Sequence, residues 1–189
     1  MSFAGEVRLV ALRLVELLEA HEIPYMMMGG LTVSIWGIPR ATYDVDLTLG
    51  VDEMGLAKFI DLMKRAEFEV DPPFERGFRD VLAGMEKIRL EWWTQASRRI
   101  EIDVFLVTTP YQKSAFSRKR RVRIEQREMW AIDPADLILH KLVAGRPKDV
   151  ADVQNILAIQ GVGDEGYVRE WAGRLGVAQE LEEALARNE

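Results

Sequence analysis

Apolar residues recur along this chain with two periods, one typical of helices and one typical of strands. Residues 5–22 carry apolar side chains at helical spacing, which predicts an amphipathic helix, and the same spacing returns over residues 51–66. Residues 25–28 form a short apolar run before two glycines, which predicts a buried strand that enters a tight turn. Residues 44–49 and 100–107 alternate polar and apolar positions, as half-buried strands do.

The remaining elements divide the chain into two parts. A short helix is expected over residues 31–36, and two further strands over residues 88–94 and 119–126. After Pro134 the pattern is helical throughout, and it predicts helices over residues 135–143, 149–159, 165–175 and 178–186. The predicted fold class is therefore α/β (α+β), with a core over residues 1–130 and a helical C-terminal part over residues 131–189.

Composition narrows the chemistry that the chain can support. Apolar residues make up 48% of its 189 residues, which is enough to build a buried core. Cysteine is absent and there are 2 histidines, so disulfides and cysteine-ligated zinc are excluded, and any metal would be a hard cation held by carboxylates. The net charge of -6 argues against nonspecific nucleic-acid binding by the whole surface, although a local basic patch is compatible with it. We see no targeting segment and no membrane span, and expect a cytoplasmic protein.

Two pairs of acidic residues stand at alternate positions of predicted strands. Asp44 and Asp46 share one face of the first strand, and Glu101 and Asp103 repeat the pattern on a later one. If the two strands are neighbours, these carboxylates converge and repel one another unless cations occupy the space between them. Such a site would hold two Mg²⁺ ions, or Mn²⁺ in their place, about 3.5–4 Å apart. Whether Glu101 joins the site is left open.

The two glycines supply the complementary half of a nucleotide site. Gly29 and Gly30 lack Cβ atoms, so backbone N–H groups can approach a ligand closely, and the helix expected from Leu31 adds the positive end of its dipole. A triphosphate would be held between this turn and the metals. The chemistry would be in-line attack of an acceptor hydroxyl on the α-phosphorus.

These motifs resemble a known superfamily. The Gly-Gly turn, the Asp-x-Asp pair and the third carboxylate within Ile-Asp-Val-Phe are similar to those of DNA polymerase beta–type nucleotidyltransferases. Within that superfamily, the segments Arg40-x-Thr42-x-Asp44-x-Asp46-Leu47 and Lys148-Asp149-x-x-Asp152 resemble AbiEii-type proteins of bacterial toxin–antitoxin and phage-defence systems. The resemblance spans residues 25–160 and implies the nucleotidyltransferase fold, a small mixed sheet flanked by helices.

The resemblance also implies a role for each matching residue. Asp44 and Asp46 would ligate both metals, and Asp103 would complete the catalytic metal site. Gly29 and Gly30 would contact the β- and γ-phosphates. Many members carry serine after the glycines, where this chain has Leu31, so nearby hydroxyls are substitutes for it. The other candidate nucleotide contacts are polar or cationic: Thr32, Ser34, Arg40, Thr42, Lys141 and Lys148.

Alternatives remain open for the function and for the later motif. An enzyme of this kind moves a nucleoside monophosphate from an NTP to RNA or protein, which the toxin resemblance favours, or to a small molecule such as an aminoglycoside. A non-catalytic interaction module, bound to an antitoxin partner, is the second hypothesis. Lys148, Asp149 and Asp152 are equally well explained as charges at the start of a helix, including an i,i+4 pair.

A basic run supplies a hypothesis for the acceptor. Read as a strand, this segment places Lys119, Arg121 and Arg123 on one face at a spacing that approximates the phosphates of single-stranded RNA. Val122 and Ile124 would pack inward. The alternative is an edge strand whose cations discourage aggregation. The complete run contains Arg118, Lys119, Arg120, Arg121 and Arg123.

Overall fold

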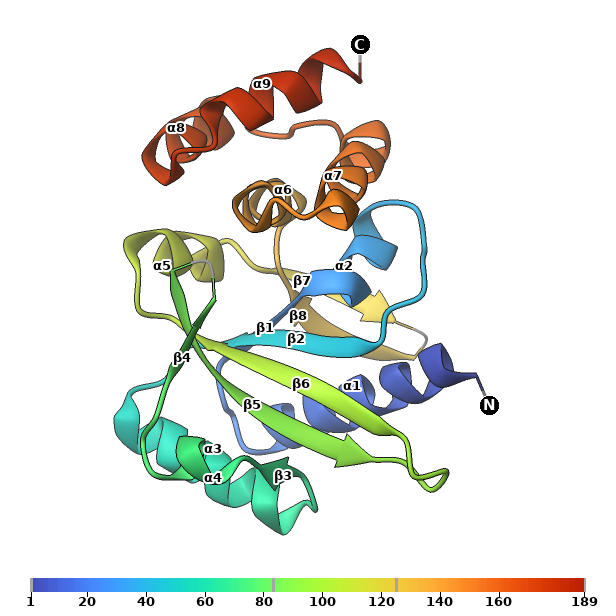
Figure 1. Ribbon diagram of the computed structural model, residues 1–189, viewed down its shortest axis with the longest axis vertical. Coiled ribbons are helices and arrows are strands. Elements are labelled where there is room, and N and C mark those ends of the chain that lie inside the picture. Colours follow the sequence, from blue (N-terminus) through green and yellow to red (C-terminus); the bar gives the residue numbers. More distant parts are fainter. Residues whose placement is uncertain (1, 83, 125, 189) are drawn as a thin grey trace.

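The structure is a computed structural model that describes residues 2–82, 84–124 and 126–188. Its elements follow one another as strands and helices and then as helices alone (Figure 1). In chain order they are α1 (Phe3–Ala20), β1 (Tyr25–Met28), α2 (Gly29–Trp36), β2 (Asp44–Leu49), α3 (Glu53–Arg65), β3 (Glu69–Val70), α4 (Pro72–Glu75), β4 (Asp80–Leu82), β5 (Met85–Trp93), β6 (Arg99–Leu106), α5 (Pro110–Ser117), β7 (Arg120–Ile124), β8 (Arg127–Ala131), α6 (Pro134–Ala144), α7 (Pro147–Gln160), α8 (Glu165–Leu175) and α9 (Ala178–Ala186).

The strands form one mixed sheet in the order β3-β5-β6-β2-β1-β8-β7, and β4 pairs with β5. The pairs β2–β6 and β1–β8 are parallel, and the other neighbours are antiparallel. The register places Asp44 opposite Glu101 and Asp46 opposite Asp103. The predicted fold class is confirmed, and the two strands that carry the acidic pairs are indeed neighbours.

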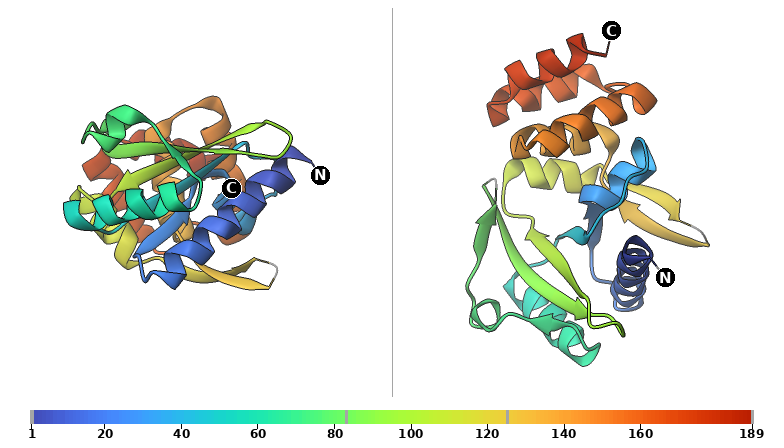
Figure 2. Two further views of the ribbon diagram at one scale, coloured as in Figure 1. Left: turned by 90° about the horizontal axis from the view of Figure 1, so that it is seen from below. Right: turned by 45° about the vertical axis from the view of Figure 1, so that its right-hand side comes forward.

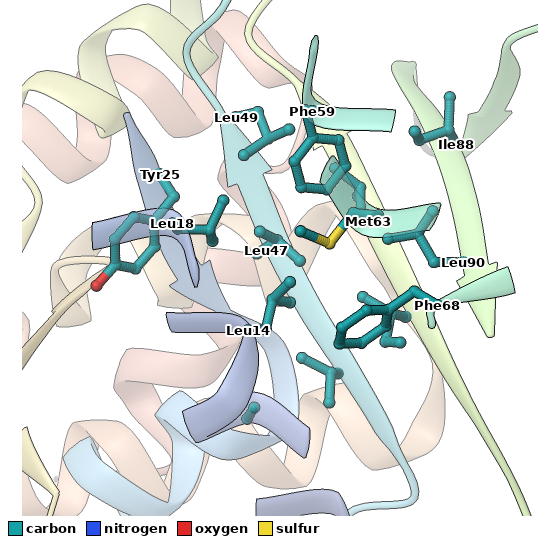
Figure 3. Close-up of a cluster of buried hydrophobic side chains, with 14 of the residues drawn as sticks. Leu14, Leu18, Tyr25, Leu47, Leu49, Phe59, Met63, Phe68, Ile88 and Leu90 are labelled. Carbon is teal, nitrogen blue, oxygen red and sulfur yellow. The ribbon is translucent and has the colours of Figure 1, made fainter. Parts of the chain in front are cut away.

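Helices cover both faces of the sheet. Figure 1 shows α1 and α3 below it and α6 to α9 above it, and the view from below in Figure 2 shows α1 and α3 side by side. The apolar run of β1 is explained by this arrangement, because Tyr25 and Met27 join the lower core while Met26 and Met28 join the upper one. The lower core is shown in Figure 3 and contains Leu14, Leu18, Leu47, Leu49, Phe59, Met63, Phe68, Ile88 and Leu90.

The alternation within β2 decides which side chains reach the upper side. Val45, Leu47 and Leu49 are fully buried in the lower core, so Asp44 and Asp46 point the opposite way. The helices above the sheet meet this polar face. Of these, α6 begins after Asp133, whose carboxylate accepts from the Ala135 N–H, and it ends at Gly145 with a φ of 63°.

Several element predictions need correction. The helix expected over residues 31–36 begins at Gly29, so both glycines belong to its first turn. The strand expected over residues 119–126 corresponds to β7, and residue 125 of that range lies outside the described residues. The pattern missed β8 because polar residues begin it and only three apolar residues follow. It also missed four further elements: β3, β4, α4 and α5.

The helical C-terminal part agrees closely with the sequence prediction. The bounds of α8 and α9 are those expected, and α6 and α7 begin and end within two residues of expectation. These helices share a core with Met26, Met28 and Phe105 of the sheet. The boundary between residues 130 and 131 stays a prediction. Within the described part of the chain, every helix is too short or too polar to cross a membrane.

Candidate active site

A cavity of about 330 Å³ lies between the polar face of β2 and β6 and the helices α2, α6 and α7. Both aspartates of β2 reach it, and so does the aspartate that lies opposite on β6. Two cationic side chains enter from α6 and α7. The structure thus brings together eight of the predicted site residues, namely Gly29, Gly30, Arg40, Asp44, Asp46, Asp103, Lys141 and Lys148.

The glycine pair lies against β2. Gly29 has a φ of +71°, and a Cβ built on it would lie 1.8 Å from Asp46 Oδ2. A Cβ on Gly30 would lie 2.3 Å from Thr42 Oγ1. The glycines therefore allow the first turn of α2 to pack directly on the carboxylate strand, a reason for their presence that sequence reasoning did not foresee.

The surroundings of Asp46 disfavour its charged form. Its pKa is raised to about 7, first by burial and then by the charges of Asp44 and Asp103, against the opposing effect of Lys141 and Arg146. Asp44 accepts a hydrogen bond of 2.8 Å from the Thr42 hydroxyl. The two neighbouring carboxylates on β2 thus favour the binding of a cation at the cavity wall.

Asp103, by contrast, is ion-paired. Lys87 Nζ lies 2.7 Å from its Oδ2, and Arg89 Nε lies 3.0 Å from its Oδ1. The Lys87 side chain is almost fully buried, with 4% of its surface exposed. Glu101 is paired with Arg99 at 2.6 Å and is not among the described residues that line the cavity. Lys87 and Arg89 were missed, although their alternate positions on one strand face were readable in the sequence.

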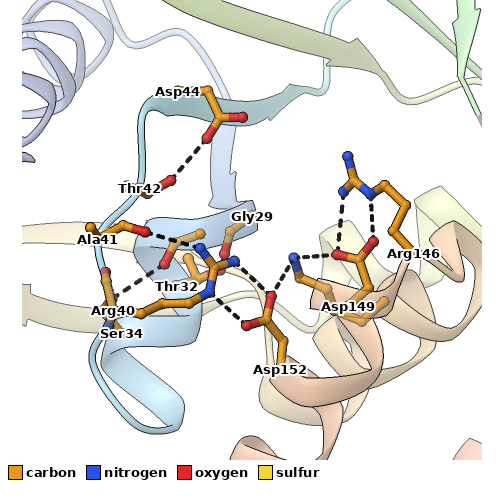
Figure 4. Close-up of polar contacts among 12 residues, drawn as sticks. Gly29, Thr32, Ser34, Arg40, Ala41, Thr42, Asp44, Arg146, Asp149 and Asp152 are labelled. Carbon is orange, nitrogen blue, oxygen red and sulfur yellow. Dashed lines mark hydrogen bonds and ion pairs between the residues drawn. The ribbon is translucent and has the colours of Figure 1, made fainter.

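A second acidic pair lies across the cavity on α7. Lys141 Nζ lies 2.9 Å from an oxygen of Asp149 and 2.9 Å from an oxygen of Asp152. Arg40 donates two hydrogen bonds of 2.7 Å to Asp152, and Arg146 donates one of 2.5 Å to Asp149 (Figure 4). Asp152 is thus held by cations from other elements. Asp149 combines an ion pair with Lys141 of α6 and a local i,i+3 pair with Arg146 at the start of α7.

The pKa values of this second pair shift the other way. Burial acts to raise the pKa of both carboxyls, but hydrogen bonds and charges outweigh it. Arg146 and Lys141 lower the pKa of Asp149, and Arg40 and Lys141 lower that of Asp152. Both aspartates are therefore stabilised as anions.

Three predicted nucleotide contacts are not among the described residues that line the cavity. The Thr32 hydroxyl is fully buried and donates to the Gly29 carbonyl at 2.9 Å, while that of Ser34 donates to the Arg40 carbonyl at 3.3 Å. Thr42 is engaged with Asp44, as described above. Their role as nucleotide contacts stays a prediction. Lining residues absent from the predicted site include Leu82, Met85, Phe105, His140, Val143 and Arg146.

The basic run is largely occupied by ion pairs within the chain. Arg118 pairs with Asp136 at 3.0 Å, Arg120 with Asp133 at 2.5 Å and Arg121 with Glu19 at 2.7 Å. Lys119 places its ammonium 3.7 Å from the centre of the Phe116 ring. Val122 and Ile124 pack against the lower core as expected. A contact between this run and RNA stays a prediction.

The donor set suits a cation that also binds the substrate. Within residues 2–82, 84–124 and 126–188, no three Asp, Glu, His or Cys side chains are arranged as a metal site. Mg²⁺ commonly binds to one or two carboxylates, with water and substrate phosphates as its other ligands. Asp44 and Asp46 provide two such carboxylates beside the cavity, so the residues present fit a magnesium ion that arrives with a nucleotide.

The fold is that of nucleotidyltransferases. The structure is similar to that of the antibiotic-resistance factor ANT(2'')-Ia, with a TM-score of 0.61, 10% identity and coverage of 96% of this chain and 98% of that chain. It is also similar to an antigenic nucleotidyltransferase-like protein from Paracoccidioides brasiliensis, with a TM-score of 0.54, 16% identity and coverage of 97% and 92%. The lincosamide antibiotic adenylyltransferase LnuA gives a TM-score of 0.52 at 14% identity, with coverage of 79% and 96%.

Sequence comparison specifies the family. Residues 14–185 match the profile of nucleotidyl transferase AbiEii toxins of the Type IV toxin–antitoxin system. The chain belongs to this family, as its motifs indicated. A search of curated protein sequences found no significant match.

Proposed function

We propose that this protein transfers a nucleoside monophosphate from an NTP to an acceptor hydroxyl, with Mg²⁺ or Mn²⁺ bound at Asp44 and Asp46. The observation that carries the proposal is the pair of neighbouring aspartates at the cavity wall, where burial and the charges of Asp44 and Asp103 raise the pKa of Asp46 to about 7. A divalent cation at this place would supply charge neutralisation for the phosphates and activation of the attacking hydroxyl.

The residues around the carboxylates suit a triphosphate. The first turn of α2 begins at Gly29 beside Asp46, and its free N–H groups form the positive end of the helix dipole. Arg146 and Lys148 line the cavity from the start of α7, and both belong to the half of the site opposite the sheet. We assign the β- and γ-phosphates to the space between this turn and these cations.

Asp103 is assigned a role at the acceptor side. Its two oxygens are held by Lys87 and Arg89, which fixes the carboxylate beside Asp46 across the strand pair. From there it would complete the catalytic metal site by giving up one of these partners. Lys87 and Arg89 thus act as positioning residues for this carboxylate.

The acceptor that we favour is RNA or protein, because the family consists of toxins. A partner antitoxin is part of the same proposal. A small-molecule acceptor is the second candidate, and the likeness to ANT(2'')-Ia and to LnuA favours it. A purely structural role as an interaction module is disfavoured, since all three carboxylates are in place around a cavity.

The test is transfer of label from α-phosphate-labelled NTPs in the presence of Mg²⁺, with total RNA, protein extract and an aminoglycoside as separate acceptors. We expect label in one acceptor class, lost in Asp44→Asn and retained in Asp61→Asn, a control in an exposed ion pair with Arg65. Absence of transfer to all three classes, by a protein that has bound Mg²⁺ and NTP, would favour the interaction module.

A further inference from the structure

A second cavity of about 330 Å³ adjoins the first one. Met85, His140 and Val143 line both, so the two cavities lie next to each other at the start of β5 and along one side of α6. The second cavity extends from there toward α5 and α8. Each cavity alone is at the lower end of the range for small-molecule sites, whereas the two together are of the size that a nucleotide needs.

The two cavities differ in chemistry. The first contains aspartates, lysines and arginines, whereas the second has an aromatic and apolar wall. Trp171 is half-buried in that wall, and the centre of its ring lies 5.2 Å from that of Tyr111. The Tyr111 ring in turn lies 5.3 Å from the ring of His140. The two adjoining cavities are therefore charged on one side and aromatic on the other.

An arginine lines the aromatic second cavity. The guanidinium of Arg174 lies 4.0 Å from the centre of the Trp171 ring and is also paired with Glu170 at 3.3 Å. An arginine at the rim can donate to the acceptor atoms on the edge of a base, while aromatic rings hold its face. His140 is neutral, because burial lowers its pKa to about 4, so it adds a ring and no charge to the wall.

We infer that the cavity at Trp171 binds a nucleobase whose phosphates lie at Asp44 and Asp46. A nucleotide has the same polarity as the two adjoining cavities, with anionic phosphates at one end and a planar, mainly apolar ring at the other. The inference rests on the proposed function and adds a second site to it. The base belongs either to the NTP itself or to the end of an RNA acceptor, and the same ring chemistry recognises both.

Two variants test the site. Trp171→Leu removes the ring but keeps an apolar side chain of moderate size, and Leu175→Trp fills the cavity from its far end without touching the first cavity. Trp93→Leu is the matched control, since Trp93 is 48% exposed at the end of β5 and lines neither cavity. Thermal unfolding of each variant verifies that it is folded.

The measurement is binding by titration calorimetry with three probes, namely Mg–NTP, Mg–tripolyphosphate and a short oligoadenylate. If the base is that of the NTP, Trp171→Leu and Leu175→Trp weaken Mg–NTP binding by about 5- to 100-fold and leave tripolyphosphate unchanged. If the base belongs to the acceptor, the two variants weaken binding of the oligoadenylate by the same factor and leave binding of Mg–NTP unchanged. Trp93→Leu changes neither.

Other outcomes would overturn the inference. Equal affinities of the wild type and both cavity variants for NTP and oligoadenylate would remove the base from this cavity while leaving the proposed function intact. An equal loss for tripolyphosphate would point to a general distortion of the site and would also overturn it. A wild-type protein that binds neither Mg–NTP nor Mg–tripolyphosphate would refute the proposed function itself.

Discussion

Two pairs of aspartates face the space between the sheet and the helices, and their surroundings differ sharply. Asp149 and Asp152 on α7 are fully buried, yet each is held by two cationic side chains. On β2, the hydroxyl of Thr42 is the partner that holds Asp44, and burial together with neighbouring carboxylates raises the pKa of Asp46. The cationic partners of Asp149 and Asp152, by contrast, lower the pKa values of those carboxyls.

Under the proposed function, the α7 pair has a structural role and the β2 pair has a catalytic one. Arg40 precedes β2, and its ion pair with Asp152 joins segments 112 residues apart, so the α7 pair fastens the helices onto the core. Asp44 and Asp46 do not join distant segments in this way. The repulsion between their carboxylates lowers the stability of the fold unless a cation is bound. Such unbalanced charge is typical of sites where a ligand completes the structure.

The two pairs also predict opposite effects of pH on stability without metal. The pKa of Asp46 is raised in the folded state, so its contribution falls as pH increases from about 4, where it ionises in the unfolded chain, toward 7. The pKa values of Asp149 and Asp152 are lowered, so their contribution is present above about 4 and is lost as pH falls through their folded values.

The largest effect is expected for Asp46→Asn. Transfer should fall by at least about a hundredfold, since even residues that only support metal ligands cost roughly 10- to 100-fold. Stability without metal should instead rise at pH 7, by roughly 1 to 4 kcal/mol, because the amide is neutral where the carboxylate is repelled. Transfer assays and denaturant unfolding in EDTA measure the two effects.

Magnesium provides the control for this prediction. Added Mg²⁺ with NTP should raise the melting temperature of the wild type and have little effect on the Asp46→Asn variant, because ligands stabilise only a protein that binds them. Wild-type transfer by Asp46→Asn, or a clear loss of its stability in EDTA, would show that Asp46 is a structural residue like those of α7.

The next effect concerns the compensated pair. Asp152→Asn should lower the free energy of unfolding by about 3–5 kcal/mol, since it leaves Arg40 and the buried Lys141 without one of their anionic partners. The matched control is Asp61→Asn, whose ion pair with Arg65 is exposed and should contribute less than about 1 kcal/mol. Denaturant unfolding at pH 7 compares them, and equal losses would remove the structural role assigned to Asp152.

Asp103 shares a feature with each pair, because it lines the cavity and is also ion-paired. Asp103→Asn should lower transfer and, unlike Asp46→Asn, also lower stability, by about 1–3 kcal/mol, because Lys87 stays buried without its anion. The double variant with Lys87→Met should recover part of that stability but none of the transfer. Non-additive unfolding energies in this double-mutant cycle would measure the pair, whereas additive ones would show that Lys87 does not hold Asp103.

Local pattern was enough to predict the parts of the fold whose residues are near in sequence. The alternation in β2 and β6 placed their acids on one face, and the apolar spacing of α8 and α9 gave their bounds. Short elements failed, because the two residues of β3 and the three of β4 carry no measurable period. Their pairing with β5 is set by tertiary contacts.

In the candidate site, too, the features that depend on local sequence were predictable and those that depend on long-range contacts were not. The carboxylates and glycines were recognisable as motifs, and the structure places them at one cavity. The partner of Arg40 was not predictable, since Asp152 lies 112 residues away and only the folded chain brings them together. Nor could the sequence show that Gly29 packs on Asp46, because that close approach depends on how α2 crosses β2.

The smallest effect is expected for the basic run. Variants of this run test whether its cations that pair with buried acids stabilise the fold, and whether its other cations bind a ligand. Arg118 and Arg120 are tied to the buried acids Asp136 and Asp133, so they resemble the α7 pair and should be left unchanged. Changing Lys119, Arg121 and Arg123 together to serine should alter stability by less than about 1 kcal/mol, because the ion pair of Arg121 with Glu19 is exposed.

If RNA is the acceptor and crosses this run, the triple variant should bind it more weakly. The slope of log affinity against log salt should shrink by roughly 2 units, since each cation that contacts a phosphate of a single strand contributes about 0.7. Affinity for Mg–NTP should stay the same, because none of the three residues lines the cavity at Asp46. An unchanged slope with intact RNA binding would mean that these cations, like Arg118 and Arg120, serve the fold, and that the acceptor reaches the carboxylates by another face.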